Sequence, residues 1–141
     1  MAARFPLIVD GSGTPAIKEI VSGDVLDLTG LQVKLGTEAT LTDGSTVAWD
    51  VSASPIAKLT LGGNRTISAP TNAVGSGQYI SLLVIQDGTG SRTLTWNAVY
   101  EFTADTAPTL TTTASKGDLF TFRYNGSKWL EVGRNLNLTL S

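Results

Sequence analysis

Apolar and polar positions alternate with a period of two along most of this chain, which is typical of β-strands. The most apolar run covers residues 79–85, and both faces of such a strand are apolar: Ile80, Leu82 and Val84 on one, Leu83 and Ile85 on the other. A strand that is apolar on both faces is covered on both sides. We therefore expect this run in the centre of a sheet or at a subunit contact.

Three glycine-containing turns separate strand-like runs and predict β-hairpins. They are Asp43-Gly44, between 37–42 and 46–51; Asp87-Gly88-Thr89-Gly90, between 79–85 and 92–96; and Asn125-Gly126, between 120–124 and 128–132. A phosphate or metal loop at 87–90 is the alternative. The hairpin is favoured because neither a lysine nor a helical pattern follows these glycines.

Further strand-like runs at 56–61 and 64–68 bring the spacing to one strand in about 8–12 residues, with turns between them. The pattern predicts an all-β fold, a single antiparallel β-sandwich or barrel domain with an extended N-terminal arm. Its core should include Trp49, which shares a face with Val47 and Val51. Phe120, Phe122 and Tyr124 should share one face of their strand in the same way.

The expected organisation has three parts. Residues 1–36 form an N-terminal arm and attachment segment, residues 37–134 the β-sandwich or barrel domain, and residues 135–141 a strand-like C-terminal tail. Pro6 suits an extended or edge segment, because proline cannot donate a ladder hydrogen bond. Residues 14–21 fit a short helix or a strand, and Gly23 favours the strand by ending the run early.

Both ends of the chain carry apolar side chains that would be a liability in water. We expect them to bind a neighbouring subunit, with the arm adding a strand to a sheet edge. These candidate partner-binding residues are Phe5, Leu7, Ile8 and Val9 in the arm and Leu136, Leu138 and Leu140 in the tail.

The composition points to a folded chain that is partly covered by partners. Of 141 residues, 41% are hydrophobic and only 16% are charged, which favours a homo-oligomer, most simply a trimer. No apolar run approaches the about 20 residues of a membrane helix, so no membrane partner is expected. The net charge of −2 and the lack of a basic patch argue against a nucleic-acid partner.

The chain has no histidine and no cysteine, so Ser–His and Cys–His nucleophile systems and thiolate or imidazole zinc sites are excluded. Asp50 is expected to pair with Arg65 or Arg92, and Asp24 and Asp27 to lie in a solvated loop. An oxygen-only calcium site at Asp43 or Asp87 is the one plausible metal site. We expect no cofactor, no metal and no catalytic residues. A glycan hydrolase would need two converging carboxylates.

Three tryptophans, Trp49, Trp96 and Trp129, lie on or at the ends of predicted strands and should pack in the core. A sugar-stacking platform is the alternative. It rests on Tyr100 and Phe102, which closely follow Trp96.

Several segments occur in an order that resembles a β-module of tailed-bacteriophage virion proteins. They are Ala48-Trp49-Asp50-Val51, Leu61-Gly62-Gly63-Asn64-Arg65-Thr66-Ile67, Pro70-Thr71-Asn72, the string from Gln86 to Trp96, and Ala107-Pro108-Thr109-Leu110. The start, Arg4-Phe5-Pro6-Leu7-Ile8-Val9-Asp10-Gly11, resembles the opening of such proteins. This module is found in tail fibres, head fibres and capsid decoration proteins, and the resemblance implies a non-enzymatic structural or adhesive domain, often trimeric.

The chain lacks a long repetitive stalk, so a capsid decoration (cement) protein is the first functional expectation. Its partner would be the major capsid protein or another virion protein. The alternative is a tail-fibre or head-fibre module that binds a host receptor or glycan. Either way we expect a location in the virion, on the capsid surface or the tail, after assembly in the host cytoplasm. The first residues do not read as a signal peptide.

Overall fold

The computed structural model describes residues 7–9, 15–17 and 36–141. The chain divides into two units, Met1–Val33 and Lys34–Ser141. In the first, β1 (Leu7–Val9) pairs antiparallel with β2 (Pro15–Ile17), Leu7 opposite Ile17. The strand preferred over a helix for residues 14–21 is therefore confirmed for residues 15–17. The rest of the expected arm, including Phe5, lies outside the described residues.

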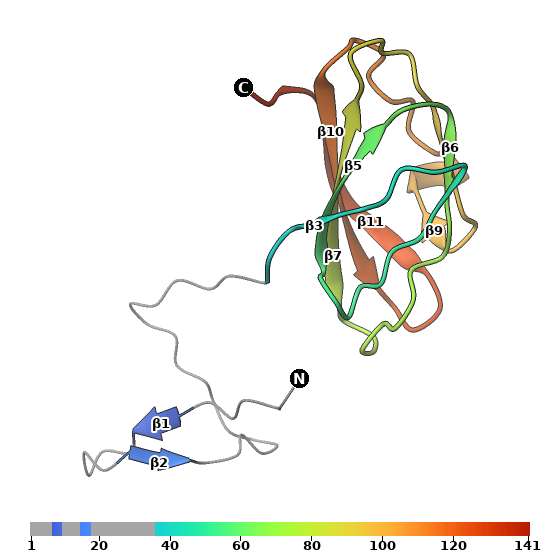
Figure 1. Cartoon of the computed structure of the whole chain (residues 1–141). Helices are drawn as coiled ribbons and strands as arrows, with labels where there is room; N and C mark the ends of the chain where they lie inside the picture. The colour runs from blue at the N-terminus through green and yellow to red at the C-terminus, as the bar shows by residue number, and fades with distance from the viewer. Residues whose placement is uncertain (1–6, 10–14, 18–35) are drawn as a thin grey trace. The chain divides into compact units, whose positions relative to one another are not determined.

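The second unit is built from coils that place successive strands alternately in two sheets (Figure 1). The strands β3 (Ala39–Thr40), β5 (Ile56–Leu61) and β7 (Tyr79–Gln86) lie side by side in one sheet and are parallel. The strands β4 (Thr46–Val47), β6 (Arg65–Ile67) and β8 (Leu94–Trp96) do the same in a second sheet. Each coil thus stacks on the one before, as in a β-solenoid.

The end of the chain closes this stack with an antiparallel hairpin. Strand β10 (Lys116–Tyr124) pairs with β7 on one side and with β11 (Trp129–Thr139) on the other. The expected turn at Asn125-Gly126 is confirmed, with Gly126 at φ 104°. A short strand, β9 (Tyr100–Glu101), runs parallel to β11, and a 3₁₀ turn, η1 (Thr103–Asp105), follows it. The six-stranded sheet has the order β3-β5-β7-β10-β11-β9.

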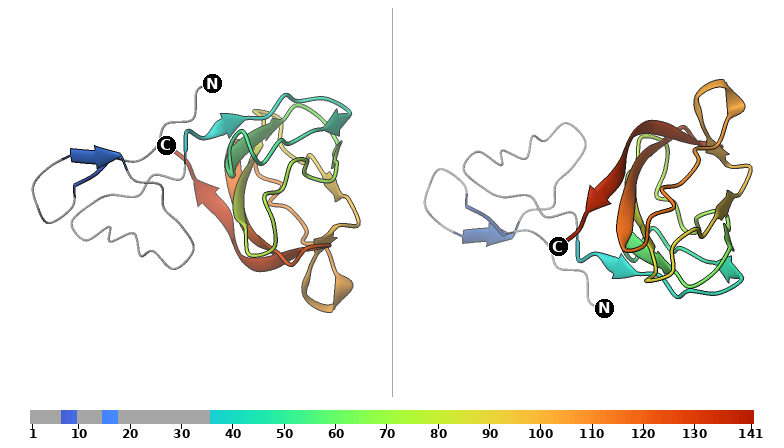
Figure 2. Two further views of the ribbon diagram at one scale, coloured as in Figure 1. Left: turned by 90° about the horizontal axis from the view of Figure 1, so that it is seen from below. Right: turned by 90° about the horizontal axis from the view of Figure 1, so that it is seen from above.

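The core residues come from both sheets and from the loops that join them. Figure 2 shows the ribbon of these sheets from below and from above. Inward positions alternate as the sequence predicted: Ile80, Leu82 and Val84 of β7 are buried, and so are Phe120 and Phe122 of β10. Trp49 is 1% exposed and donates its indole N–H to the Ser54 carbonyl at 3.0 Å. The largest side chains sit at the centre: Trp49, Trp129, Phe120, Phe122, Leu59, Leu61 and Ile67.

The all-β class is confirmed for the described residues, but the antiparallel sandwich or barrel is wrong. Most pairings are parallel and follow the coils, and only the β7–β10 and β10–β11 pairings of the second unit are antiparallel. The reason is that the chain turns a corner after each strand from β3 to β7, so that the next strand belongs to the other sheet. Their backbone partners then come from the next coil.

Two of the three expected hairpins are also wrong for this reason. Asp43-Gly44 joins β3 to β4 and the loop at 87–90 joins β7 to β8, which lie in different sheets. The chain bends at both places. Asp43 binds Arg65 of the next coil, and Asp87 binds groups of its own corner. Asp87 Oδ1 accepts from the amides of Thr89 and Gly90 at 2.9 and 2.8 Å. The glycines therefore mark corners of a coil.

Candidate functional site

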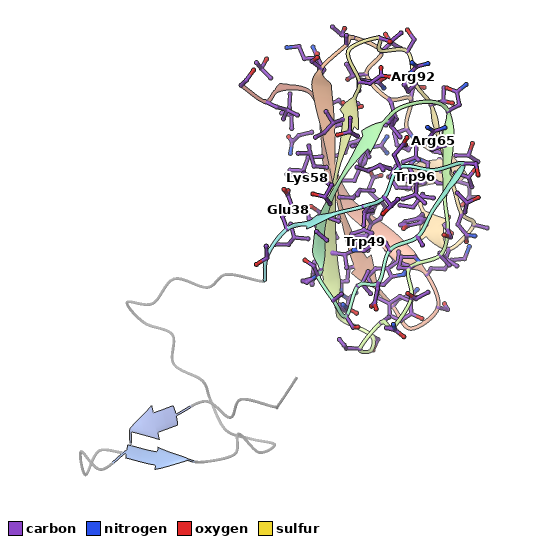
Figure 3. The ribbon with its side chains drawn as sticks, in the orientation of Figure 1. Glu38, Trp49, Lys58, Arg65, Arg92 and Trp96 are labelled. Carbon is purple, nitrogen blue, oxygen red and sulfur yellow. The ribbon has the colours of Figure 1, made fainter. Side chains whose placement is uncertain are left out.

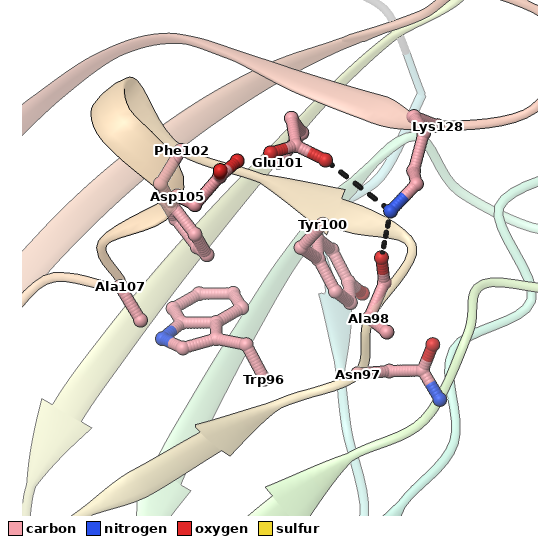
Figure 4. Close-up of a pocket in the computed structure, with 9 residues that line it drawn as sticks. All are labelled: Trp96, Asn97, Ala98, Tyr100, Glu101, Phe102, Asp105, Ala107 and Lys128. Carbon is pink, nitrogen blue, oxygen red and sulfur yellow. Dashed lines mark hydrogen bonds and ion pairs between the residues drawn. The ribbon is translucent and has the colours of Figure 1, made fainter.

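A cavity of about 300 Å³ opens where β8 ends and β9 begins (Figure 4). Its walls combine aromatic side chains with charged and amide groups. The lining residues are Trp96, Asn97, Ala98, Tyr100, Glu101, Phe102, Asp105, Ala107 and Lys128. We call this cavity the Trp96 pocket.

The local sequence explains how the pocket forms. The amide of Asn97 donates to the Ile67 carbonyl at 3.1 Å, so the residue that follows β8 is tied to the end of β6. The Asn97 side-chain oxygen then accepts from the Val99 amide at 3.0 Å, and the Asn97 carbonyl accepts from the Tyr100 amide at 3.0 Å. This Asx-type turn reverses the chain. It delivers β9 to the edge of β11, where Tyr100 lies opposite Trp129.

Trp96 forms the aromatic wall of the pocket and is half-buried. Its ring contacts four others edge to face or tilted. The centroid distances are 5.1 Å to Tyr100, 5.3 Å to Phe102, 5.1 Å to Phe120 and 5.7 Å to Phe122. Such pairs contribute about 0.5–1.5 kcal/mol each beyond their area burial. Trp96 is therefore held rigidly, with part of its surface left accessible.

Charged groups line the rim. Lys128, near the start of β11, places its ammonium nitrogen 3.2 Å from a Glu101 carboxylate oxygen and donates to the Ala98 carbonyl (Figure 4). Asp105 is exposed and lies in η1, where it and Ala104 both have positive φ, 53° and 54°. Two consecutive non-glycine residues in the left-handed region cost about 1–2 kcal/mol each, so the turn that carries Asp105 is strained.

Two buried polar atoms of the pocket residues have no hydrogen-bond partner within the part of the chain that the structure describes: the Trp96 indole nitrogen and the Tyr100 hydroxyl. Burial raises the pKa of the Tyr100 hydroxyl far above its usual range, so this group stays protonated and remains a donor. Buried donors without partners are rare because each costs about 1–3 kcal/mol. These two donors are buried behind the pocket lining and are not part of its accessible surface.

None of the residues predicted to bind partners is among the residues that line the Trp96 pocket, and Phe5 lies outside the described residues. Leu7, Ile8 and Val9 form β1 in the first unit, where only the backbone is described. Residues 135–139, expected as a separate tail, continue β11 along β10. In that segment Leu136 and Leu140 are 42% and 43% exposed, and Leu138 is half-buried opposite Gly117. Whether any of them binds a partner stays a prediction.

Of the aspartates that the sequence singled out, Asp43, Asp50 and Asp87 make ion pairs or cap turns, and Asp24 and Asp27 lie outside the described residues. Figure 3 labels the arginines of the two ion pairs, Arg65 and Arg92. Asp43 binds Arg65 through two bonds of 2.7 and 2.6 Å, and Asp87 binds Arg92 at 2.9 and 3.0 Å. The predicted pairing of Asp50 with either arginine is wrong. Asp50 instead accepts from the amide and hydroxyl of Ser52 and from the side-chain amide of Asn72.

Sequence reasoning identified the aromatic part of the Trp96 pocket and missed its polar part. Trp96, Tyr100 and Phe102 were the residues of the suggested sugar platform. Of the three tryptophans, Trp49 and Trp129 are core residues as predicted, being 1% and 2% exposed. Lys128 could not be assigned to the pocket beforehand, because only the parallel β9–β11 pairing brings it beside Glu101.

Within the described ranges, no group of three or more acidic, histidine or cysteine side chains is arranged to hold a metal ion. In the same part of the chain, no helix is long and apolar enough to span a membrane. The expectation of a metal-free, cofactor-free protein stays a prediction.

Comparison with known proteins identifies one family. Residues 37–129 match the family described as "Putative phage tail fibre C-terminal domain". No curated protein matches the chain, and no solved structure does. The matched segment spans well over half of the 141 residues and contains every coil of the second unit together with the Trp96 pocket. The chain therefore belongs to this phage tail fibre C-terminal domain family and is a module of a phage virion protein.

Proposed function

We propose that this chain is the receptor-binding module of a phage tail fibre, a non-enzymatic adhesive domain that contacts the host surface. The observation that carries the proposal is the family match over residues 37–129. The Trp96 pocket supports it, because binding sites are concave, with apolar walls and a few placed polar groups. The tail-fibre alternative thus takes precedence over the capsid decoration reading.

The pocket contains two carboxylates, Glu101 and Asp105, so a glycan hydrolase has to be weighed. Hydrolysis needs a general acid whose pKa is raised, usually by burial in an apolar site. Asp105 is exposed, and Glu101 is already paired with Lys128. These surroundings favour binding over bond cleavage.

The capsid decoration reading is supported by the apolar residues at both ends of the chain. Leu136 and Leu140 are exposed on the second unit, and a shell protein would provide an apolar surface for them. The family match names a tail fibre and not a capsid protein, so the capsid decoration reading is the second candidate.

Two measurements separate the candidates. Purified chain, added in excess to host cells, is expected to slow adsorption of the phage that encodes it. A receptor-binding module would do so because it occupies the receptors that the phage needs. Quantitative mass spectrometry of virions should find a handful of copies. Hundreds of copies per virion, or binding to capsids that lack the protein, would replace the tail-fibre proposal with the decoration reading.

A catalytic role is tested on the same material. Host surface polysaccharide incubated with the chain should release no new reducing ends. Release that disappears in a Glu101→Gln, Asp105→Asn double variant would overturn the non-enzymatic proposal.

A further inference from the structure

We propose that the Trp96 pocket binds a neutral hexose unit of a surface saccharide and discriminates against acidic sugars. This inference rests on the proposed receptor-binding function and deepens it. It names a site and a ligand class, and each can fail without the adhesive role failing.

The size and the wall of the pocket fit one or two sugar rings. Its volume of about 300 Å³ lies at the small end of ligand sites. The half-buried Trp96 provides a flat apolar surface that suits the C–H face of a pyranose ring. Tyr100, Phe102, Phe120 and Phe122 already hold this ring in place. Binding therefore costs little side-chain entropy at the main contact.

Polar groups on the rim match the hydroxyls of a sugar. The Asp105 carboxylate accepts hydrogen bonds and forms no salt bridge among the described residues. The amide of Asn97 and the ammonium of Lys128 are donors placed around the same cavity. Figure 4 shows Asp105 and the Glu101–Lys128 pair arranged around the aromatic rings. A polyhydroxylated ring can satisfy donors and acceptors of both kinds.

The charges of the rim determine which sugars fit. Lys128 is neutralised by Glu101 at 3.2 Å, so Asp105 leaves the lining with one net negative charge. A hexuronate or another anionic sugar would meet a like charge with no free cation to compensate for it. A neutral hexose encounters no such repulsion.

The backbone of η1 independently marks this place. Ala104 and Asp105 hold a strained left-handed conformation that projects Asp105 at the rim. A strained backbone conformation persists only where the surrounding structure holds it in place. Such conformations are concentrated at ligand-binding sites. The Tyr100 hydroxyl and the Trp96 indole nitrogen have no partner among the described residues; their side chains line the cavity, but these two atoms are themselves buried.

The test is a titration of the full-length chain with methyl glycosides of neutral hexoses and, separately, with methyl glucuronide. Trp49 and Trp129 are buried, so a ligand-induced change in tryptophan fluorescence reports on Trp96. We expect a neutral hexose to saturate this signal at roughly millimolar affinity and the glucuronide to bind at least about tenfold more weakly. No response to any neutral hexose, or tighter binding of the glucuronide, would overturn the inference.

Variants locate the site. Asp105→Asn should weaken the neutral hexose about tenfold and reduce the discrimination against the glucuronide. Ala107→Phe should fill the pocket and abolish binding while the thermal melt stays unchanged. Glu38→Gln is the matched control: it also converts a carboxylate to an amide, in the Glu38–Lys58 pair outside the pocket (Figure 3), and should change nothing. Equal binding by the three variants would place the sugar elsewhere and refute the site.

Adsorption competition separates this inference from the proposed function. If wild-type chain blocks adsorption and the Ala107→Phe variant blocks it equally well, the receptor-binding role stands and the pocket inference fails. If wild-type chain never blocks adsorption, the receptor-binding role itself fails, whatever the sugar titrations show.

Discussion

Trp49 is a residue whose role the sequence predicted and the structure confirms. It lies between Val47 and Val51, is 1% exposed, and its indole N–H is satisfied by the Ser54 carbonyl. We expect Trp49→Ala to lower the free energy of unfolding by about 3–5 kcal/mol, as for other buried large aromatics. Urea denaturation of both proteins measures this. A loss under about 1 kcal/mol would mean that the side chain is not a core residue in solution.

Asp118 is a buried charged residue that the sequence did not reveal. It is 2% exposed, and its carboxylate accepts three hydrogen bonds, from the amide and hydroxyl of Thr111 and from the amide of Asn137. Hydrogen bonds of this kind make burial of a charge tolerable. The side chain thus joins the loop before β10 to the end of β11.

Acid should weaken the second unit through its corner aspartates. The hydrogen bonds from Arg65 and Arg92 hold the pKa values of Asp43 and Asp87 below their usual 3.8. A carboxyl whose pKa is lower in the folded state stabilises it above the unfolded pKa, and this contribution is lost as the pH falls below about 4. Melting temperatures should therefore drop between about pH 5 and about pH 2. Asp87→Asn should reduce that drop, and an unchanged profile would contradict this role.

The corner at 87–90 distinguishes two glycines that look alike in the sequence. Gly90 has φ 75°, and a Cβ there would lie 2.5 Å from the Thr112 carbonyl oxygen; Gly88 has nothing within 4 Å. Gly90→Ala should lower the free energy of unfolding by about 2–4 kcal/mol, since it adds both left-handed strain and overlap with a neighbouring loop. The matched control, Gly88→Ala, should stay within about 0.5 kcal/mol.

Denaturation curves of the two glycine variants measured side by side test the corner directly. Equal losses would show that the loop adopts another conformation, such as the tight hairpin turn that the sequence suggested. That hairpin would need both glycines for its backbone angles.

The second unit should fold without the first, because every core residue among those that the structure describes lies within residues 34–141. We expect a chain that begins at Lys34 to melt within a few degrees of the full-length protein. Circular dichroism measures this. In the same truncation, loss of virion incorporation with the fold intact would assign attachment to residues 1–33.

Self-association is expected from the outer side of the six-stranded sheet. Leu83 and Ile85 of β7 face outward and are half-buried, and Leu140 packs near Leu83 above Gly117. Exposed Tyr79 and Val132 add to this apolar surface. Light scattering on purified protein should give a trimer. A monomer at high micromolar concentration would contradict self-association in solution. If the wild-type chain is a trimer, Leu83→Lys should shift it toward the monomer.

The amino-acid sequence alone was enough to predict the all-β class, the inward faces of the strands and the last hairpin. These features depend on local alternation and on turn residues, which act over a few positions. It was also enough to connect Trp96 with Tyr100 and Phe102, because they are close in the chain. The family resemblance likewise followed from short segments in a fixed order.

Only the tertiary structure decided which strands pair. A sequence such as Asp43-Gly44 can redirect the chain either in a hairpin or at the corner of a coil. Which of the two forms depends on the strand with which β4 pairs, and in this structure that strand is β6 of the next coil. The same long-range pairing brings Lys128 to Glu101 and completes the pocket beside Trp96. Parallel neighbours come from different coils, so their contacts join residues far apart in the chain, and no local pattern encodes them.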